Sequence, residues 1–389
     1  MKKLFSLLIV ILLSCSALAQ TRLLRHPSYH NGKVAFSYLG DIWVGNEDGS
    51  GLQRLTVHKA RDIYPRFSPD GKWIAFSSNR YGNYDVFVIP AAGGEAKQLT
   101  YHSGSDTVVD WSPDGKRVVF QANRGRLFPG IPSLYEVSID GGLERALETD
   151  WGYWGGYSPD GKKLAFNRHP MVWWRKHYRG AYAADLWVMD VAQKKFTRLG
   201  DNDYKGNYFW PMYGNGGDIY FVSDRLPDET RIKPGSAEVL KSVNNIWKMS
   251  DKGGKPVQVT HHTDGNLFFP TVSADRRVIV YEDNFGIWKL DTQTGKTAEL
   301  KFNIVSDDKE NDLEMITVRG ETEGYALSPT SKRAAVSAHG EIFTVATDQG
   351  DVQRVTQSYS RETNPEWSPD GKWIAFVSDK SGQDEVWIA

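Results

Sequence analysis

The sequence is poor in features that would place it outside ordinary globular proteins. Its 389 residues contain one cysteine, Cys15, so no intramolecular disulfide framework can form. The formal net charge is −1. A balance this close to neutral excludes the broad basic surface of a nucleic-acid-binding protein and the strong charge excess of a disordered one. A hydrophobic fraction of 40% is enough to build an apolar core, and core packing alone must hold the fold.

Motifs that carry chemistry are also missing. The sequence has no His-Glu-x-x-His, no Gly-x-Ser-x-Gly elbow and no phosphate-binding glycine loop. His261 and His262 are adjacent but have no acidic cluster beside them, so a surface loop is favoured over a metal site. The sequence therefore predicts no catalytic residue, no metal and no cofactor in this chain.

The first nineteen residues have the organisation of a signal peptide and are left out of the fold. Lys2 and Lys3 supply a positive start, and the apolar run Leu4–Leu13 is too short for a spanning helix. Ala17-Leu18-Ala19 then supplies the small residues that signal peptidase requires.

These features predict cleavage before Gln20 and an exported, periplasmic protein. The alternative is a lipoprotein anchored through Cys15, because Leu12-Leu13-Ser14-Cys15 also has the form of a lipid-attachment motif.

A repeated motif dominates the rest of the sequence. An aromatic residue is followed by Ser-Pro-Asp-Gly-Lys and then by an alternating apolar segment. Full copies occupy residues 67–76, 111–120, 157–166 and 367–376, and degenerate copies occupy residues 272–276 and 327–331. The first copies recur about every 45 residues, which is the length of one four-stranded blade of a β-propeller.

Turn chemistry explains the motif. Proline pre-sets φ at the second position of a tight turn, aspartate tolerates the third, and glycine takes the positive φ that follows. The alternating segment then enters a strand with one buried face. Because its serine and aspartate recur in successive copies, as at Ser68 and Asp70, the sequence favours a structural role for them over a catalytic one.

A second marker follows in each repeat and reads acid or asparagine, aliphatic, aromatic. We interpret it as the third strand of each blade. An outer strand ending in Leu-Thr or a relative follows most copies, as at Leu55-Thr56 and Leu99-Thr100. Clear and weaker copies together begin at Asp41, Asp85, Ser133, Asp185, Asn245, Gly286, Glu341 and Glu385.

The resulting fold class is all-β: a six-bladed β-propeller followed by the first blades of a second, truncated β-propeller. Residues 1–19 form the signal peptide, 20–300 the six-bladed β-propeller, 301–323 a linker, and 324–389 the first two blades (incomplete) of the second propeller. The linker contains the polar run Asp307-Asp308-Lys309-Glu310, for which a long outer loop is the alternative.

Three blades carry extra residues between their second and third strands, at 125–132, 169–184 and 226–243. Equivalent connections emerge on one side of a propeller, so these inserts should cluster on one rim. Aromatic and cationic side chains alternate in the blade-four insert, which suits the binding of carboxylates or peptide termini. The alternative is a loop that packs its tryptophans on a neighbouring blade. The candidate substrate-binding residues are Trp173, Trp174, Arg175, Lys176, His177, Tyr178 and Arg179.

Two segments resemble the tricorn protease family. Residues 324–345, from Gly324-Tyr325-Ala326 onward, are similar to the start of the family's second propeller, and Trp174 to Gly180 resembles a Trp-Lys-x-Tyr-Arg-Gly segment of its first. The resemblance covers the mature chain from about Leu23 to its end. The Ser-Pro-Asp-Gly motif alone is shared with the Tol-system periplasmic propeller and with prolyl-oligopeptidase relatives.

The resemblance implies an exported serine peptidase that trims oligopeptides, built from a six-bladed propeller, a seven-bladed propeller and catalytic regions around a PDZ domain. The family's catalytic residues match nothing up to Ala389, so this chain is expected to be a fragment that gates or binds oligopeptide substrates and products. The resemblance also allows a homo-oligomer of the full-length protein. The alternatives are a non-enzymatic envelope protein-binding propeller, as in the Tol system, and a propeller fused to an amidohydrolase.

Overall fold

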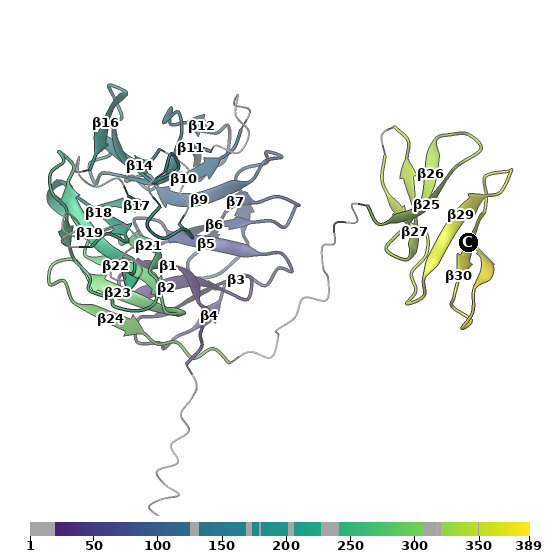
Figure 1. Cartoon of the computed structure of the whole chain (residues 1–389), viewed down its shortest axis with the longest axis horizontal. Coiled ribbons are helices and arrows are strands. Elements are labelled where there is room, and N and C mark those ends of the chain that lie inside the picture. Colours follow the sequence, from purple (N-terminus) through teal and green to yellow (C-terminus); the bar gives the residue numbers. More distant parts are fainter. Residues whose placement is uncertain are drawn as a thin grey trace, which may run out of the picture. The chain divides into compact units, whose positions relative to one another are not determined.

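The structure is a computed structural model that describes residues 20–124, 132–168, 173–178, 180–200, 206–226, 241–305, 317, 320–348 and 350–389. The chain divides into two compact units, Met1–Glu310 and Asn311–Ala389 (Figure 1). Apart from the short 3-10 turn Asn215–Gly217, the regular elements defined in the described residues are β-strands, which confirms the all-β prediction. In this described part, no helix is long and apolar enough to cross a membrane.

The first unit contains six four-stranded antiparallel sheets, each formed by consecutive strands. The first three sheets consist of β1 (Arg25–His30), β2 (Lys33–Tyr38), β3 (Asp41–Asn46) and β4 (Gln53–Arg54); β5 (Asp62–Phe67), β6 (Trp73–Ser78), β7 (Asp85–Pro90) and β8 (Lys97–Gln98); and β9 (Asp106–Trp111), β10 (Arg117–Ala122), β11 (Ser133–Ser138) and β12 (Arg145–Ala146).

The other three sheets complete the ring. They consist of β13 (Tyr153–Tyr157), β14 (Lys163–Asn167), β15 (Leu186–Asp190) and β16 (Lys195–Leu199); β17 (Phe209–Tyr213), β18 (Asp218–Ser223), β19 (Asn245–Ser250) and β20 (Val257–Gln258); and β21 (Phe268–Val272), β22 (Val278–Asp283), β23 (Gly286–Asp291) and β24 (Thr297–Leu300). The first strands of neighbouring sheets contact one another in sequence, and β21 contacts β1 again. These six strands therefore surround the axis of a propeller.

The Ser-Pro-Asp-Gly motif forms the turn between the first and second strands. In the second sheet the Gly71 N–H donates to the Ser68 carbonyl at 2.9 Å, and the Ser68 hydroxyl donates to Asp70 at 2.7 Å. Gly71 has a φ of 71°, as the turn chemistry predicts. The structural role assigned to the repeated serine and aspartate is thereby confirmed.

The acid–aliphatic–aromatic marker lies on the third strand of every sheet or directly before it, as predicted. Its aliphatic residue is fixed by the threonine that follows the outer strand. Thr56 accepts a hydrogen bond from the Ile42 N–H at 2.9 Å, and Thr100 accepts one from the Val86 N–H at 2.9 Å. This contact explains why Leu-Thr recurs at the end of the repeat.

An arginine after the second strand braces several sheets, a feature that the sequence interpretation missed. Arg80 pairs with Asp62 at the start of the first strand at 3.1 Å and lies over the Phe87 ring at 4.5 Å. Arg124 and Asp106 repeat the pair in the third sheet. Because both aspartates are fully buried, the arginine supplies the countercharge that makes their burial tolerable.

The ring closes without exchange of a strand between the first and sixth sheets. The Thr21 N–H donates to the Phe302 carbonyl at 3.0 Å, and the Leu23 N–H donates to the Phe285 carbonyl at 3.0 Å. The Phe302 ring lies 4.9 Å from Phe36 and is 1% exposed. Phe302 therefore belongs to the core of the first unit, which extends beyond the predicted boundary at residue 300.

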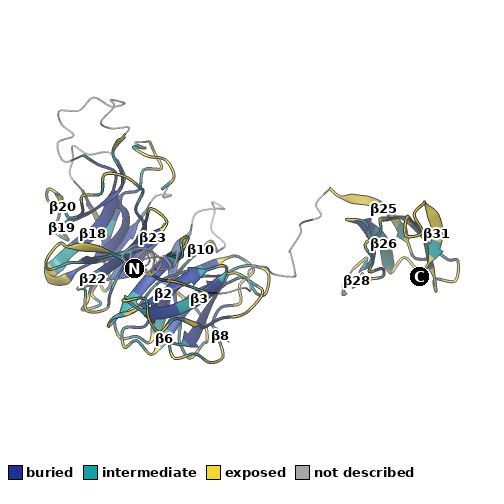
Figure 2. Cartoon of the chain, turned by 90° about the horizontal axis from the view of Figure 1, so that it is seen from below, coloured by how far each residue is buried: buried dark blue, intermediate teal, exposed yellow. Residues whose placement is uncertain are grey.

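The second unit holds the four-stranded sheet β25 (Thr322–Leu327), β26 (Arg333–Ala338), β27 (Glu341–Ala346) and β28 (Gln353–Arg354), and the three-stranded sheet β29 (Glu362–Trp367), β30 (Ile374–Ser378) and β31 (Glu385–Ile388). Its strands are less buried than those of the first unit (Figure 2). Tyr325, Val386 and Ile388 are exposed to 80%, 75% and 67%. Each of the two sheets thus keeps apolar residues on its surface.

Candidate functional site

The axis of the first unit is closed by a cluster of aromatic side chains, the axial plug, formed by His26, Tyr64, Trp154, Trp210 and Phe269. Each comes from the first strand of a different sheet and lies at a β-bulge, where the pairing register with the second strand shifts. A bulge turns a side chain out of the regular alternation of a strand. Here the bulges direct aromatic rings to the axis.

All five plug residues have a positive φ, from 34° at Trp154 to 56° at Tyr64. Such a backbone costs roughly 1–2 kcal/mol for a residue with a side chain and persists only where its surroundings impose it. Side chains of the preceding sheet help to impose it. Gln121 accepts the Trp154 N–H at 3.1 Å, and Asn167 accepts the Trp210 N–H at 3.1 Å.

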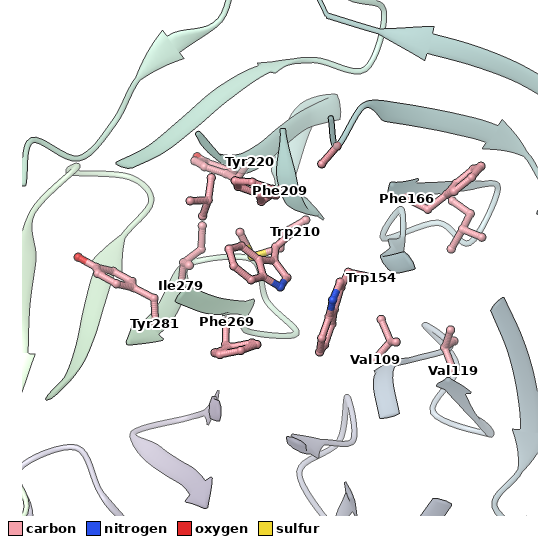
Figure 3. Close-up of a cluster of buried hydrophobic side chains, with 14 of the residues drawn as sticks. Val109, Val119, Trp154, Phe166, Phe209, Trp210, Tyr220, Phe269, Ile279 and Tyr281 are labelled. Atoms are coloured by element: carbon pink, nitrogen blue, oxygen red, sulfur yellow. The ribbon is translucent and has the colours of Figure 1, made fainter. Parts of the chain in front are cut away.

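The rings contact one another across the axis. The centroids of Tyr64 and Trp154 are 5.0 Å apart, those of His26 and Tyr64 are 4.1 Å apart, and those of Trp210 and Phe269 are 5.4 Å apart. Figure 3 shows Trp154, Trp210 and Phe269 converging between the surrounding strands. In the third sheet the bulged position carries Val109, so one side of the plug is aliphatic.

Burial keeps the plug uncharged. Desolvation lowers the pKa of His26 well below its usual 6.5, helped by the nearby charge of Arg25. Desolvation also raises the pKa of Tyr64 to about 12. Both plug groups are therefore neutral near pH 7.

A buried carboxylate lies beside the plug and joins the last sheet to the first. Glu282 accepts hydrogen bonds from Arg25 Nε at 2.6 Å and from the His26 N–H at 2.6 Å. Burial nevertheless raises the pKa of Glu282 to about 7, because the charged form is removed from water. Ring closure and the charge state of Glu282 are therefore linked.

The blade-four insert reaches the plug from the end of the propeller at which second strands lead into third strands, here called the insert end. Trp173 packs against Phe268 and Phe269, with ring centroids 5.1 Å and 5.6 Å apart. The insert thus connects the fourth sheet with the sixth. Trp173 takes the packing role that the sequence allowed as the alternative.

The next residues of the insert face solvent. Trp174 is 65% exposed, and Arg175 and Lys176 are also exposed. The Arg175 guanidinium lies over the Tyr178 ring at 4.4 Å. Arg179, the last of the predicted binding residues, lies outside the described residues. The candidate site thus divides into a packed anchor, Trp173, and an exposed aromatic and cationic strip, here called the strip, formed by Trp174, Arg175 and Lys176.

His177 anchors the other end of this strip to the fifth sheet. Its backbone N–H donates to the Asp224 carboxylate, and its Nε2 lies 3.1 Å from the Ser242 hydroxyl. The groups are those of a serine hydrolase triad, but the Ser242 hydroxyl donates to the Asp224 carbonyl at 3.0 Å. The 3.7 Å between His177 Nδ1 and the Asp224 carboxylate is too long for a hydrogen bond. The constellation positions the insert.

These contacts bring the fourth and fifth inserts together, as predicted for one rim. Residues 125–131 of the third insert lie outside the described residues.

The sequence interpretation missed the axial plug, although a signal was present. In the second, fourth and sixth repeats an aromatic residue stands four positions before the turn serine, at Tyr64, Trp154 and Phe269.

A cavity of about 130 Å³ lies on the axis on the other side of the plug, at the Ser-Pro-Asp-Gly turns, here called the turn end. Its lining includes prolines of three turns and the charged side chains of Arg66, Asp110 and Arg276. Within the described part of the chain, no three His, Cys, Asp or Glu side chains are grouped as they would be to hold a metal ion.

Comparison with known proteins identifies proteins that are similar to this chain. A family model described as the tricorn protease N-terminal beta propeller domain matches residues 21–296. The tricorn protease homolog 1 of Streptomyces coelicolor is 28% identical over 376 residues, which cover 94% of this chain and 33% of that protein. A TolB homolog of Chlorobium luteolum is 36% identical over 85 residues, 21% of this chain and 20% of that protein.

Among solved structures, the crystal structure of the tricorn protease aligns with a TM-score of 0.61 at 20% identity, covering 94% of this chain and 34% of that one. At this identity the alignment establishes the fold. The chain spans about a third of the length of the tricorn relatives it matches.

Proposed function

Because the chain belongs to the tricorn protease N-terminal β-propeller family, we propose that it is the propeller portion of an exported, tricorn-like serine peptidase, in which it handles oligopeptides. The observation that carries the proposal is the position of the blade-four insert. Trp173 rests on the axial plug while Trp174, Arg175 and Lys176 stay exposed next to it. A peptide held by the strip would lie at the entrance to the axis.

The strip has the chemistry of a peptide-binding surface. An exposed indole offers a flat apolar face on which side chains and peptide groups stack, and the two cations offer hydrogen bonds to carboxylates. Among the described residues no salt bridge within 4.0 Å involves either cation, and the described contact of Arg175 is with the Tyr178 ring. Binding at this strip would be sequence-tolerant and would favour acidic or C-terminal groups.

The axial plug is the gate in this proposal. Its rings close the axis, and opening it requires Trp173 to leave Phe269 and the plug side chains to rotate. The His177–Asp224–Ser242 contacts hold the insert in the closed position. A peptide that binds the strip more tightly when the plug is open than when it is closed would shift the equilibrium toward the open state.

Hydrolysis itself is assigned to parts of the full-length protein other than this chain, and the full-length protein is proposed to form a homo-oligomer. The proposal also includes export through the signal peptide at residues 1–19. The sequence offers no nucleophilic elbow or metal motif to this chain, and the one Ser–His–Asp constellation described has the wrong hydrogen-bond direction. The chain therefore contributes recognition and access rather than bond cleavage.

The experiment is a binding titration with fluorescein-labelled oligopeptides of about ten residues, followed by anisotropy. The variant Trp174→Ala/Lys176→Ala should weaken binding at least tenfold. Its matched control is Trp373→Ala/Lys372→Ala, which removes the same residue types from exposed positions of the second unit and should change nothing. Equal affinities for both variants would contradict the proposal. Binding to folded envelope proteins but not to peptides would favour a Tol-like role instead.

A further inference from the structure

The turn-end cavity contains more positive than negative charge. Arg66 comes from the second sheet, Asp110 from the third, and Arg276 from the turn of the sixth. No salt bridge within 4.0 Å joins either arginine to a carboxylate in the described part of the chain. Arg66 donates to the carbonyls of Val109 at 2.9 Å and Pro65 at 2.8 Å, so its described hydrogen bonds are to uncharged groups.

Arg66 is kept from water, and Arg276 is partly buried. Arg66 is 5% exposed, and desolvation lowers its pKa to about 10, so it still carries its charge near neutral pH. Desolvation also lowers the pKa of Arg276. The two arginines share the single carboxylate of the cavity lining, that of Asp110, so one positive charge remains in excess and an anion in the cavity would reduce the cost of burying it.

Arg276 reaches the cavity from a strained turn. It occupies the position that glycine holds in the regular Ser-Pro-Asp-Gly turns, and it keeps their positive φ, 62° against 71° at Gly71. A side chain in this conformation strains the backbone. Its guanidinium extends across the axis to the Tyr157 carbonyl of the fourth sheet at 3.5 Å. Among the described turns between first and second strands, this one places a long charged side chain at the glycine position, and that side chain lines the cavity.

Two hydrogen-bond donors of the lining residues have no partner among the described residues. They are Arg276 Nε and Trp210 Nε1, both buried. Buried polar atoms are almost always satisfied by protein, water or ligand. An acceptor-rich ligand in this positively charged cavity would suit both donors.

We propose that the turn-end cavity binds a monocarboxylate, whose oxygens accept hydrogen bonds from Arg66 and Arg276. A single negative charge fits because Asp110 offsets one of the two arginines and repels a dianion. The apolar body of the ligand would rest on Trp154, Met212 and the turn prolines. The site lies on the far side of the plug from the blade-four insert, so it does not rest on the proposed peptide-binding strip.

The carboxylate has two chemical sources, a free organic acid and the C-terminus of a peptide. Benzoate and N-acetylphenylalanine represent them, and benzamide and inorganic phosphate serve as uncharged and dianionic controls. Isothermal titration of the purified chain should show binding of at least one acid and at least tenfold weaker binding of both controls. The tighter of the two acids identifies the source.

Arg276→Gly is the decisive variant, because glycine is the residue that the regular turns carry at this position and the fold should be retained. It should weaken carboxylate binding at least tenfold, while the exposed neighbour variant Arg277→Ala should bind like the unmodified chain. The proposal is wrong if neither acid binds, if phosphate binds as well as benzoate, or if Arg276→Gly binds unchanged.

Discussion

The indole ring of Trp173 meets the ring of Phe269 edge-on, with centroids 5.6 Å apart. Trp173 belongs to an insert of the fourth sheet, and Phe269 belongs to the innermost strand of the sixth. The contact therefore bridges non-neighbouring sheets over the axis of the first unit. It makes the insert a part of the closed axis rather than a free surface loop.

Removal of this contact should cost stability, whereas removal of its neighbour should not. Trp173→Ala should lower the free energy of unfolding of the first unit by about 2 kcal/mol, because a half-buried aromatic contact is lost. Trp174→Ala should stay within about 0.5 kcal/mol, since Trp174 is 65% exposed. Denaturant unfolding followed by tryptophan fluorescence measures both. A larger loss for Trp174→Ala would contradict the assigned roles.

The buried Asp–Arg pairs should be the most sensitive electrostatic contacts of the first unit. Arg80→Ala leaves Asp62 buried without its countercharge and should cost about 3 kcal/mol. Lys72→Ala breaks the exposed pair with Asp70 and should cost less than about 0.5 kcal/mol. Urea midpoints of the two variants test this difference. Equal midpoints would mean that the bracing role of Arg80 is wrong.

Much of this fold could be predicted from the sequence because local chemistry repeats. The turn at Ser68–Gly71 needs only proline, aspartate and glycine in order, and the third strands are marked by the same three-residue pattern in each sheet. The Arg80–Asp62 brace was also present in the sequence as an Asn-Arg pair after the second strand, repeated at Asn123-Arg124. It was missed because the sequence alone does not distinguish an exposed arginine from an arginine that pairs with a buried aspartate.

The candidate site was harder to predict because it depends on the shape of the ring. No local pattern shows that Tyr64 and Phe269 meet on one axis, since this requires six sheets to close and five bulges to turn inward. Trp173 and Trp174 are identical neighbours in sequence, yet the first is packed and the second is exposed. Arg276 stands beside Arg277 in a turn of the sixth repeat, and nothing in that pair shows its reach across the axis, which depends on its positive φ.

The first unit should lose stability as the pH rises through the titration of Glu282. Burial raises the pKa of Glu282 from 4.5 to about 7 in the folded chain, so the folded state holds its proton more tightly than the unfolded state does. The contribution is complete below pH 4.5 and is lost as the pH rises to about 7. Relative to Glu282→Gln, the unmodified chain should lose about 2–3 kcal/mol between pH 5 and pH 8. A constant difference over this range would show that Glu282 has an ordinary pKa.

Export should depend on the alanines before Gln20 rather than on Cys15. Intact-mass measurement of the secreted or periplasmic protein should give a chain that begins at Gln20. Ala19→Arg should leave the precursor unprocessed, because the small residue required at the cleavage position is lost. Cys15→Ser should leave cleavage and release unchanged. Release from the membrane only in the Cys15→Ser variant would favour the lipoprotein alternative.

The most direct test of the central claim is to incubate the purified chain with a mixture of oligopeptides and measure bound and cleaved peptide in one experiment by mass spectrometry. The account predicts that peptides are retained by the chain, that retention falls for Trp174→Ala/Lys176→Ala, and that no peptide is shortened. Two results would contradict the claim that the propeller handles peptides without hydrolysing them. One is peptide cleavage by the highly purified chain, and the other is that the chain retains no peptide.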